Sequence, residues 1–167
     1  MTTTTAGFDT IDEATRLWKE HGWGEAAPGM AAVTSLMRAQ QLSLARVETA
    51  LKPYAVTFAR YEVLMLLLFS RRGTLPMSRI GARLQVHATS VTNAVDRLER
   101  ARLVRRLPHP SDRRATLVEI TQAGRDLALA ATDDLNREVF GDLGLSDADI
   151  DALIAILTRM RSNAGDF

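Results

Sequence analysis

The feature that most constrains the fold is the stretch 88–101, whose side chains separate onto two faces of a helix. Four apolar side chains share one face and are expected to point into a core: Val91, Ala94, Val95 and Leu98. The opposite face carries short hydrogen-bonding side chains at its start and arginines towards its end: Thr89, Thr92, Asn93, Asp96, Arg97 and Arg100. Such a helix buries one face and presents the other to a partner.

The elements around this helix predict a winged helix-turn-helix. An apolar helix from Thr57 to about Phe69 and a short helix at 77–84 precede it. Two β-prone runs, 103–107 and 116–120, follow it and enclose the proline-stiffened basic segment 108–114. These runs predict a hairpin with a long basic tip. We therefore expect a mainly α fold with a small β-wing, in the lobe 55–120.

The distribution of charge favours a polyanion as the partner of this lobe. Between residues 70 and 114 there are eleven arginines and three acids, a net charge of +8. The whole chain has a net charge of +1, so the remainder sums to −7. A helix of short polar side chains fits the major groove of DNA, while arginines neutralise phosphates. A solvated arginine-rich surface on a small α/β core is the alternative.

The segments outside the lobe predict further helices. Residues 1–29 form an arm with a short helix at 11–23, interrupted by Gly22, Gly24, Pro28 and Gly29. Residues 30–54 carry an apolar seven-residue repeat that fits a dimerisation helix and a buried helix equally well, and Pro53 ends it. In the region 121–167, Thr121 and Ser146 are expected to cap two more helices.

An enzyme finds little support in the sequence. Without cysteine there is no thiol nucleophile and no cysteine metal site. His21, His87 and His109 lie in three different predicted elements, with no acid at metal-ligand spacing. No glycine-rich phosphate loop or nucleophile elbow is present. We expect no metal and no cofactor. A protein-interaction module is a further alternative, but it would not need a basic wing.

No membrane association is expected either. No apolar run approaches the roughly 20 residues of a membrane-spanning helix. The first residues, Met-Thr-Thr-Thr-Thr, lack the basic region and apolar stretch of a secretory signal. These observations predict a cytoplasmic protein.

Four segments resemble the MarR family of bacterial transcriptional regulators: 58–64, 90–99, 103–106, and the wing signature Ser-Asp-Arg-Arg at 111–114 with Val-Glu-Ile-Thr-Gln-Ala-Gly at 118–124. The resemblance covers roughly residues 30–160. It implies a homodimer with interlocking helices at 30–51, 121–140 and 146–161. It also implies a transcriptional regulator, a repressor, that binds an inverted-repeat operator in double-stranded DNA. A DNA-binding architectural protein or a ligand-independent regulator is the alternative.

The resemblance also assigns roles to individual residues. Asp112 would brace the wing, and Arg114 would enter the minor groove. His87 stands where the family often has serine or another short capping residue, so its role is open between a helix cap and a phosphate donor. The expected DNA-binding residues are His87, Thr89, Ser90, Thr92, Asn93, Arg97, Arg105, Asp112, Arg113 and Arg114, with Arg106 and Arg79 as further phosphate contacts.

Many members of the family release DNA when a small aromatic acid or phenol enters a cleft between the dimer helices and the DNA-binding lobe. The resemblance therefore implies an effector of this class. Trp18, His21, Trp23 and Arg60 are candidate contacts, because a tryptophan-bearing N-terminal segment could cover such a cleft. The alternative, which we favour, is that this segment only packs against the core.

Overall fold

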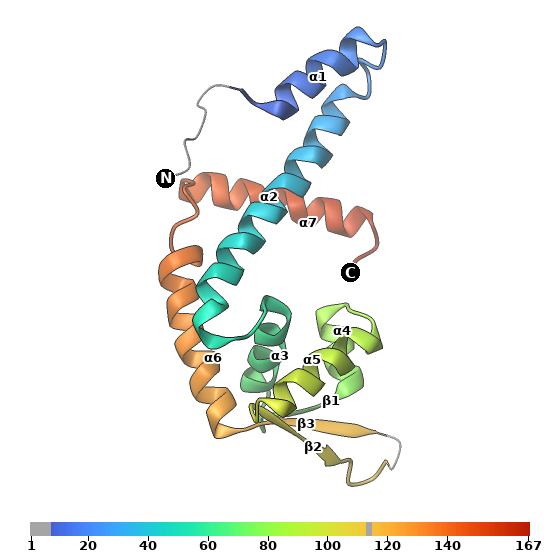
Figure 1. Ribbon diagram of the computed structural model, residues 1–167. Helices are drawn as coiled ribbons and strands as arrows, with labels where there is room; N and C mark the ends of the chain where they lie inside the picture. Colours follow the sequence, from blue (N-terminus) through green and yellow to red (C-terminus); the bar gives the residue numbers. More distant parts are fainter. Residues whose placement is uncertain (1–7, 113–114) are drawn as a thin grey trace. The chain divides into compact units, whose positions relative to one another are not determined.

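The computed structural model describes residues 8–112 and 115–167 (Figure 1). The chain divides into two compact units, one ending at Thr49 and the other running from Ala50 to Phe167. Helices dominate both units, and a small antiparallel sheet lies in the second. Within the two described ranges, no helix combines the length and the apolar character that crossing a membrane requires.

The first unit consists of α1 (Thr10–Glu20) and most of α2 (Ala27–Leu51). Asp9 caps α1 by accepting a hydrogen bond of 2.8 Å from the backbone N–H two residues further on. The expectation that Pro28 and Gly29 interrupt the chain before the long helix is wrong, since both lie in the first turn of α2. Proline is tolerated there because first-turn N–H groups have no partner within the helix.

The apolar repeat of α2 is exposed along much of its length. Val33, Met37 and Leu44 have exposed fractions of 50%, 63% and 40%. Val47 and Leu51, at the end of the same repeat, are buried. An exposed apolar repeat is typical of an interaction surface.

The second unit contains the predicted helix-turn-helix. Its helices are α3 (Phe58–Phe69), α4 (Met77–Leu84) and α5 (Ala88–Arg100). All three contribute buried side chains: Tyr61, Val63, Leu64 and Leu67 from α3, Ile80 from α4, and Val91, Val95 and Leu98 from α5. The predicted two-faced character of α5 is confirmed, except that Ala94 is half-buried at the edge of its apolar stripe and lines a surface groove.

Three short strands form the sheet in the order β1–β3–β2: β1 (Thr74–Pro76), β2 (Val104–Pro108) and β3 (Thr116–Ile120). β2 and β3 are the predicted hairpin, and the mainly α fold with a small β-wing is confirmed. β1 is not predicted, because three residues ending in proline show no alternating pattern. It exists because it pairs with β3 along the edge that β2 leaves open.

The C-terminal part begins with α6 (Gln122–Leu135), which continues into a π-helical turn, η2 (Asn136–Phe140), and ends with α7 (Asp147–Asn163). Both predicted caps are confirmed. Thr121 Oγ1 accepts a hydrogen bond of 3.0 Å from the backbone N–H of Gly124, and Ser146 Oγ accepts one of 3.3 Å from that of Asp149. α7 has no buried side chain.

The start of α6 packs tightly against the lobe. The backbone N–H of Thr121 donates to the carbonyl oxygen of Leu103 at 3.0 Å. A Cβ added at Gly124 would lie 2.1 Å from that same oxygen. Since a backbone atom cannot turn aside as a side chain can, only glycine fits here. The Thr-x-x-Gly segment thus joins α6 to the turn between α5 and β2.

Hydrogen bonds also fix α6 to the beginning of the lobe. Tyr54, in the short helix η1 (Lys52–Tyr54), donates to Asp134 Oδ2 at 2.6 Å. Two residues before Asp134 on α6, the Tyr61 hydroxyl lies 2.8 Å from Thr132 Oγ1. The hydrogen bond from Tyr54, supported by Arg137, holds the pKa of Asp134 below its ordinary value. Polar contacts therefore specify where the lobe lies on α6.

Candidate nucleic-acid interface

The turn between α4 and α5 positions the exposed face of α5. Gln85 has a left-handed backbone with φ of 53°, which ends α4 and redirects the chain. His87 is the N-cap of α5, and its Nδ1 accepts a hydrogen bond of 3.3 Å from the backbone N–H of Thr89. Since Nδ1 accepts, the ring proton of this tautomer lies on Nε2, where it can donate to a phosphate. His87 therefore caps the helix, and its two nitrogens allow both roles that the sequence left open.

Short polar side chains occupy the exposed face of α5 near its N-terminus. Ser90, Thr92 and Asn93 are all exposed. The Thr92 hydroxyl donates to the carbonyl oxygen of Ala88 at 3.0 Å. Within the described part of the chain, the side chains of Ser90 and Asn93 form no hydrogen bond. The Asn93 carboxamide offers a donor and an acceptor together, which is the pair that recognises the major-groove edge of adenine.

An open groove continues this face between α5 and the first turn of α3. Its volume is 580 Å³, and it is lined by Thr57, Ala59, Arg60, Ser90, Asn93, Ala94, Asp96, Arg97 and Arg100. Among residues 8–112 and 115–167, none of its three arginines forms an ion pair. Three guanidinium groups without acidic partners give the groove a positive potential that attracts phosphate.

Sequence reasoning missed that the first turn of α3 borders this face. Thr57 occupies the N-cap position of α3, as predicted, but its side chain makes no capping hydrogen bond. Arg60, predicted to contact an effector, lines the same groove as Asn93 and Arg97. The available signal was a positive charge in the first turn of a mostly apolar helix, which is hard to explain by packing alone.

The wing is the β2–β3 hairpin with its connecting loop. His109 stabilises the loop, because its Nδ1 accepts a hydrogen bond of 3.2 Å from the backbone N–H of Asp112. The carbonyl oxygen of Asp112 in turn accepts one of 3.1 Å from the backbone N–H of Ala115. Arg113 and Arg114, expected to contact DNA, lie outside the described residues.

Two adjacent arginines of β2 have partners in different elements. Arg105 is exposed and forms an ion pair with Glu119 of β3, and this hydrogen bond raises the pKa of Arg105. Arg106 is half-buried and donates to Asp96 at 2.5 Å and to Glu99, both on α5. Burial lowers the pKa of Arg106, but the hydrogen bonds to the two carboxylates outweigh this effect and raise it. The geometry does not support the expectation that Arg106 meets phosphates.

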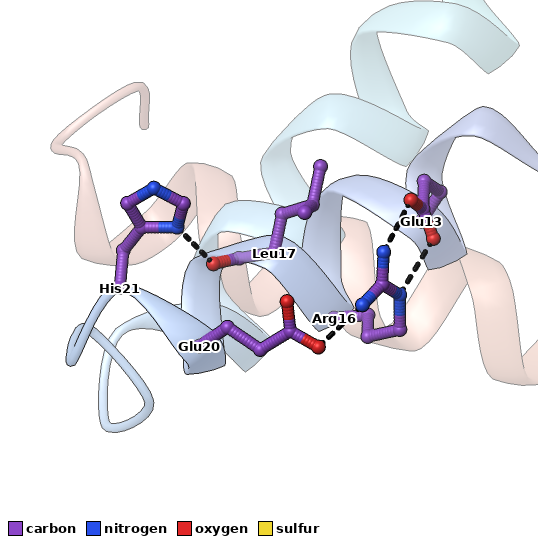
Figure 2. A network of polar contacts seen from close by, with 5 residues as sticks. All are labelled: Glu13, Arg16, Leu17, Glu20 and His21. Atoms are coloured by element: carbon purple, nitrogen blue, oxygen red, sulfur yellow. Dashed lines mark hydrogen bonds and ion pairs between the residues drawn. The ribbon is translucent and has the colours of Figure 1, made fainter.

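The four residues expected to contact an effector are divided between the two units. In the first unit, the ring of Trp23 lies 5.0 Å from that of Trp18 and 5.6 Å from that of His21, measured between centroids. Figure 2 shows the His21 ring hydrogen-bonded through Nδ1 to the carbonyl oxygen of Leu17, at 2.8 Å. Arg60 belongs to the second unit. The structure therefore brings the three N-terminal rings into one cluster.

The fold and the exposed face of α5 define a class of protein. A polar helix following a tight turn, arginines without acidic partners beside it, and an adjacent β-hairpin are the parts of a winged helix-turn-helix DNA-binding lobe. Among the described side chains, no group of three or more His, Cys, Asp or Glu could hold a metal ion.

Comparison with known proteins identifies the family. The MarR family profile matches residues 56–116. The solved structure of Sco5413, a MarR family transcriptional regulator from Streptomyces coelicolor, is 51% identical, with a TM-score of 0.77 over 84% of this chain and 97% of that one. The chain belongs to the MarR family of DNA-binding transcriptional regulators. Membership of a family of regulators sets the enzyme alternative aside.

Other relatives agree with this assignment. MhqR, an HTH-type transcriptional regulator of Bacillus subtilis (strain 168), is 31% identical over 64% of this chain and 74% of its own length. YhbI, from the same organism, is 30% identical, and the chain spans about half of it (51%). The transcriptional repressor CouR, solved bound to a 23-mer DNA duplex, is 25% identical over 75% of this chain and 89% of that chain, with a TM-score of 0.70.

Proposed function

We propose that the protein is a homodimeric, sequence-specific repressor that acts in the cytoplasm and binds an inverted-repeat operator. The observation that carries this proposal is the exposed face of α5, where short polar side chains lie beside arginines without acidic partners. The major groove admits an α-helix and presents a distinct pattern for each base pair. A two-fold dimer places two such helices about one turn of DNA apart. The repressor CouR bound to DNA supports the same direction of regulation.

Each predicted DNA-binding residue has a role in this proposal. Ser90, Thr92 and Asn93 contact base edges, while His87, Thr89 and Arg97 contact phosphates. Arg105, which is paired with Glu119, holds β2 against β3 within the wing. Asp112 braces the wing, so that Arg113 and Arg114 reach the minor groove, where the negative potential is strong. To these we add Arg60 and Arg100, because the groove that they line opens beside Asn93 and Arg97.

The test of this proposal is Asn93→Ala. The variant loses a base-edge contact, so its affinity for the operator should fall by about 1–3 kcal/mol, while its affinity for random DNA should change little. The operator is a duplex that the wild-type protein selects from a random-sequence library, and affinities are measured by fluorescence anisotropy. Asn163→Ala, which removes the same group at the end of α7, is the matched control. Equal losses on both duplexes would contradict base recognition by Asn93.

We also propose that a small aromatic acid or phenol releases the DNA. The clustered rings of Trp18, His21 and Trp23 offer surfaces on which an aromatic ring could stack. In the alternative, a ligand-independent regulator, the cluster only packs the N-terminal segment.

Fluorescence separates these two functions, because both tryptophans of the chain lie in the cluster. Titration with benzoate or phenol should quench the tryptophan emission and lower operator affinity over the same concentration range. A Trp23→Leu variant should lose both responses while keeping its affinity for DNA. Unchanged emission together with unchanged operator affinity would favour the ligand-independent regulator.

A further inference from the structure

Arg106 connects the wing to the DNA-reading helix by three hydrogen bonds. Its backbone N–H donates to Glu99 Oε1 at 2.8 Å, and its guanidinium donates to Glu99 Oε2 and to Asp96 Oδ1, the latter at 2.5 Å. The Arg106 side chain is 27% exposed, and both carboxylate side chains are 38% exposed. The guanidinium fork of one β2 residue thus spans two carboxylates one turn apart on α5.

The position of these two carboxylates connects the Arg106 contact to the DNA-reading residues of α5. Asp96 lines the same groove as Asn93 and Arg97, so any rotation of α5 that breaks its contact with Arg106 also moves both of those residues. Left without a partner, Asp96 and Glu99 would place two negative charges beside the groove, where they would repel phosphates. The single positive charge of Arg106 offsets one of these two charges, and its guanidinium donates hydrogen bonds to both carboxylates.

We infer that Arg106 is a positioning residue, which holds α5 at a fixed angle to the wing so that both engage one DNA duplex, and which does not itself contact a phosphate. This inference rests on the proposed DNA-binding function. Its physical basis is that a bidentate fork fixes direction as well as distance, whereas a single charge fixes neither. Arg105, the preceding residue, pairs with Glu119 and so remains within the sheet.

The sharpest test removes the partners of Arg106. The double variant Asp96→Asn/Glu99→Gln makes each chain more positive by two charges. If Arg106 only positions α5, affinity for the selected operator falls roughly tenfold, although the added positive charge keeps or raises affinity for random DNA. If Arg106 instead contacts phosphate, releasing it strengthens binding to both duplexes. Operator affinity equal to or above that of the wild type overturns the proposal.

The matched control lies on α1, where Arg16 has the same chemistry. Its guanidinium donates to Glu13 at 2.6 Å and 2.8 Å and also pairs with Glu20 (Figure 2). Glu13→Gln/Glu20→Gln adds the same two charges in the first unit without changing a residue of α5 or β2, and it should not weaken operator binding. An equal loss in this control would attribute the effect to net charge and overturn the proposal.

Two further variants keep the proposal testable if the double variant does not fold. Arg106→Lys keeps the charge but cannot bridge two carboxylates, so the same selective loss of operator affinity is expected. Arg106→Gln should leave the slope of log operator affinity against log salt concentration unchanged. Loss of one phosphate contact per lobe would instead reduce this slope by about 2 per dimer. An operator affinity of Arg106→Lys equal to that of the wild type, or a reduced salt slope for Arg106→Gln, overturns the proposal.

Failure of this inference can be told apart from failure of the proposed function. A wild-type protein that enriches no sequence from the library contradicts both. A wild-type protein that enriches a sequence, while the double variant binds it at least as tightly, overturns the role of Arg106 alone.

Discussion

At micromolar concentration the wild-type protein is expected to sediment at twice the 18.4 kDa mass of its chain, and Ile154→Glu as a monomer that binds the operator poorly. Ile154, Ile156 and Met160 of α7 are 50–57% exposed in the single chain. Burying one isoleucine contributes about 1.5–3 kcal/mol, and a two-fold interface contains each change twice. The dimer dissociation constant should therefore rise by about 10²–10⁴-fold.

The control for this prediction is Ala155→Glu. Residue 155 lies about 100° around the helix from Ile154, away from the apolar stripe, so the same charge is introduced without entering the interface. Because Ile154 is 57% exposed, both variants should retain the circular dichroism of the folded chain. A wild-type protein that sediments at 18.4 kDa, or an Ile154→Glu variant that remains a dimer, would contradict the proposed interface.

The helix-turn-helix could be predicted from the sequence almost residue by residue. The bounds expected for α4 match the structure, and α5 ends one residue before the expected position. These elements depend on local signals, namely a two-faced pattern and turn residues that the chain itself supplies. The caps at Thr121 and Ser146 are local in the same way, since each accepts a hydrogen bond from the backbone N–H three residues further on.

What the sequence did not reveal depends on contacts between distant segments. β1 exists only because it pairs with β3. Helical periodicity places Asp96 on the exposed face of α5, but it carries no information that Arg106, ten residues further on, lies within hydrogen-bonding distance. The groove likewise requires the first turn of α3 to lie against α5, a fact of packing that no local pattern encodes.

The charge count illustrates the same distinction. The net +8 between residues 70 and 114 is correct as a sum, but it does not tell which arginines are available to DNA. In the structure, Arg106 is occupied by two carboxylates and Arg105 by one. Arg60, which lies outside that block, joins Arg97 and Arg100 in the groove. Ion pairing therefore shifts the expected phosphate contacts away from β2 and towards α3 and α5.

Operator affinity is expected to fall by about 10³–10⁵-fold between 50 and 200 mM salt, because about six to ten phosphates are neutralised per dimer. Each lobe has three arginines in its groove and two more exposed on α4, Arg79 and Arg83. None of these five forms an ion pair within the described ranges. Three to five phosphate contacts per lobe correspond to the six to ten phosphates that a dimer is expected to neutralise. The residues outside 70–114 have a net charge of −7, which should repel DNA and confine it to the two lobes.

One substitution makes this electrostatic prediction specific. Arg97→Ala removes one phosphate contact per lobe, so it should reduce the slope of log affinity against log salt by about 2 per dimer. Arg159→Ala removes the same charge from α7, where Arg159 is exposed, and should leave the slope unchanged. The slopes are obtained from anisotropy titrations on the selected operator at several salt concentrations. If Arg159→Ala reduced the slope as much as Arg97→Ala, the DNA would lie across the helices assigned to the dimer, and the placement of the operator on the two lobes would be wrong.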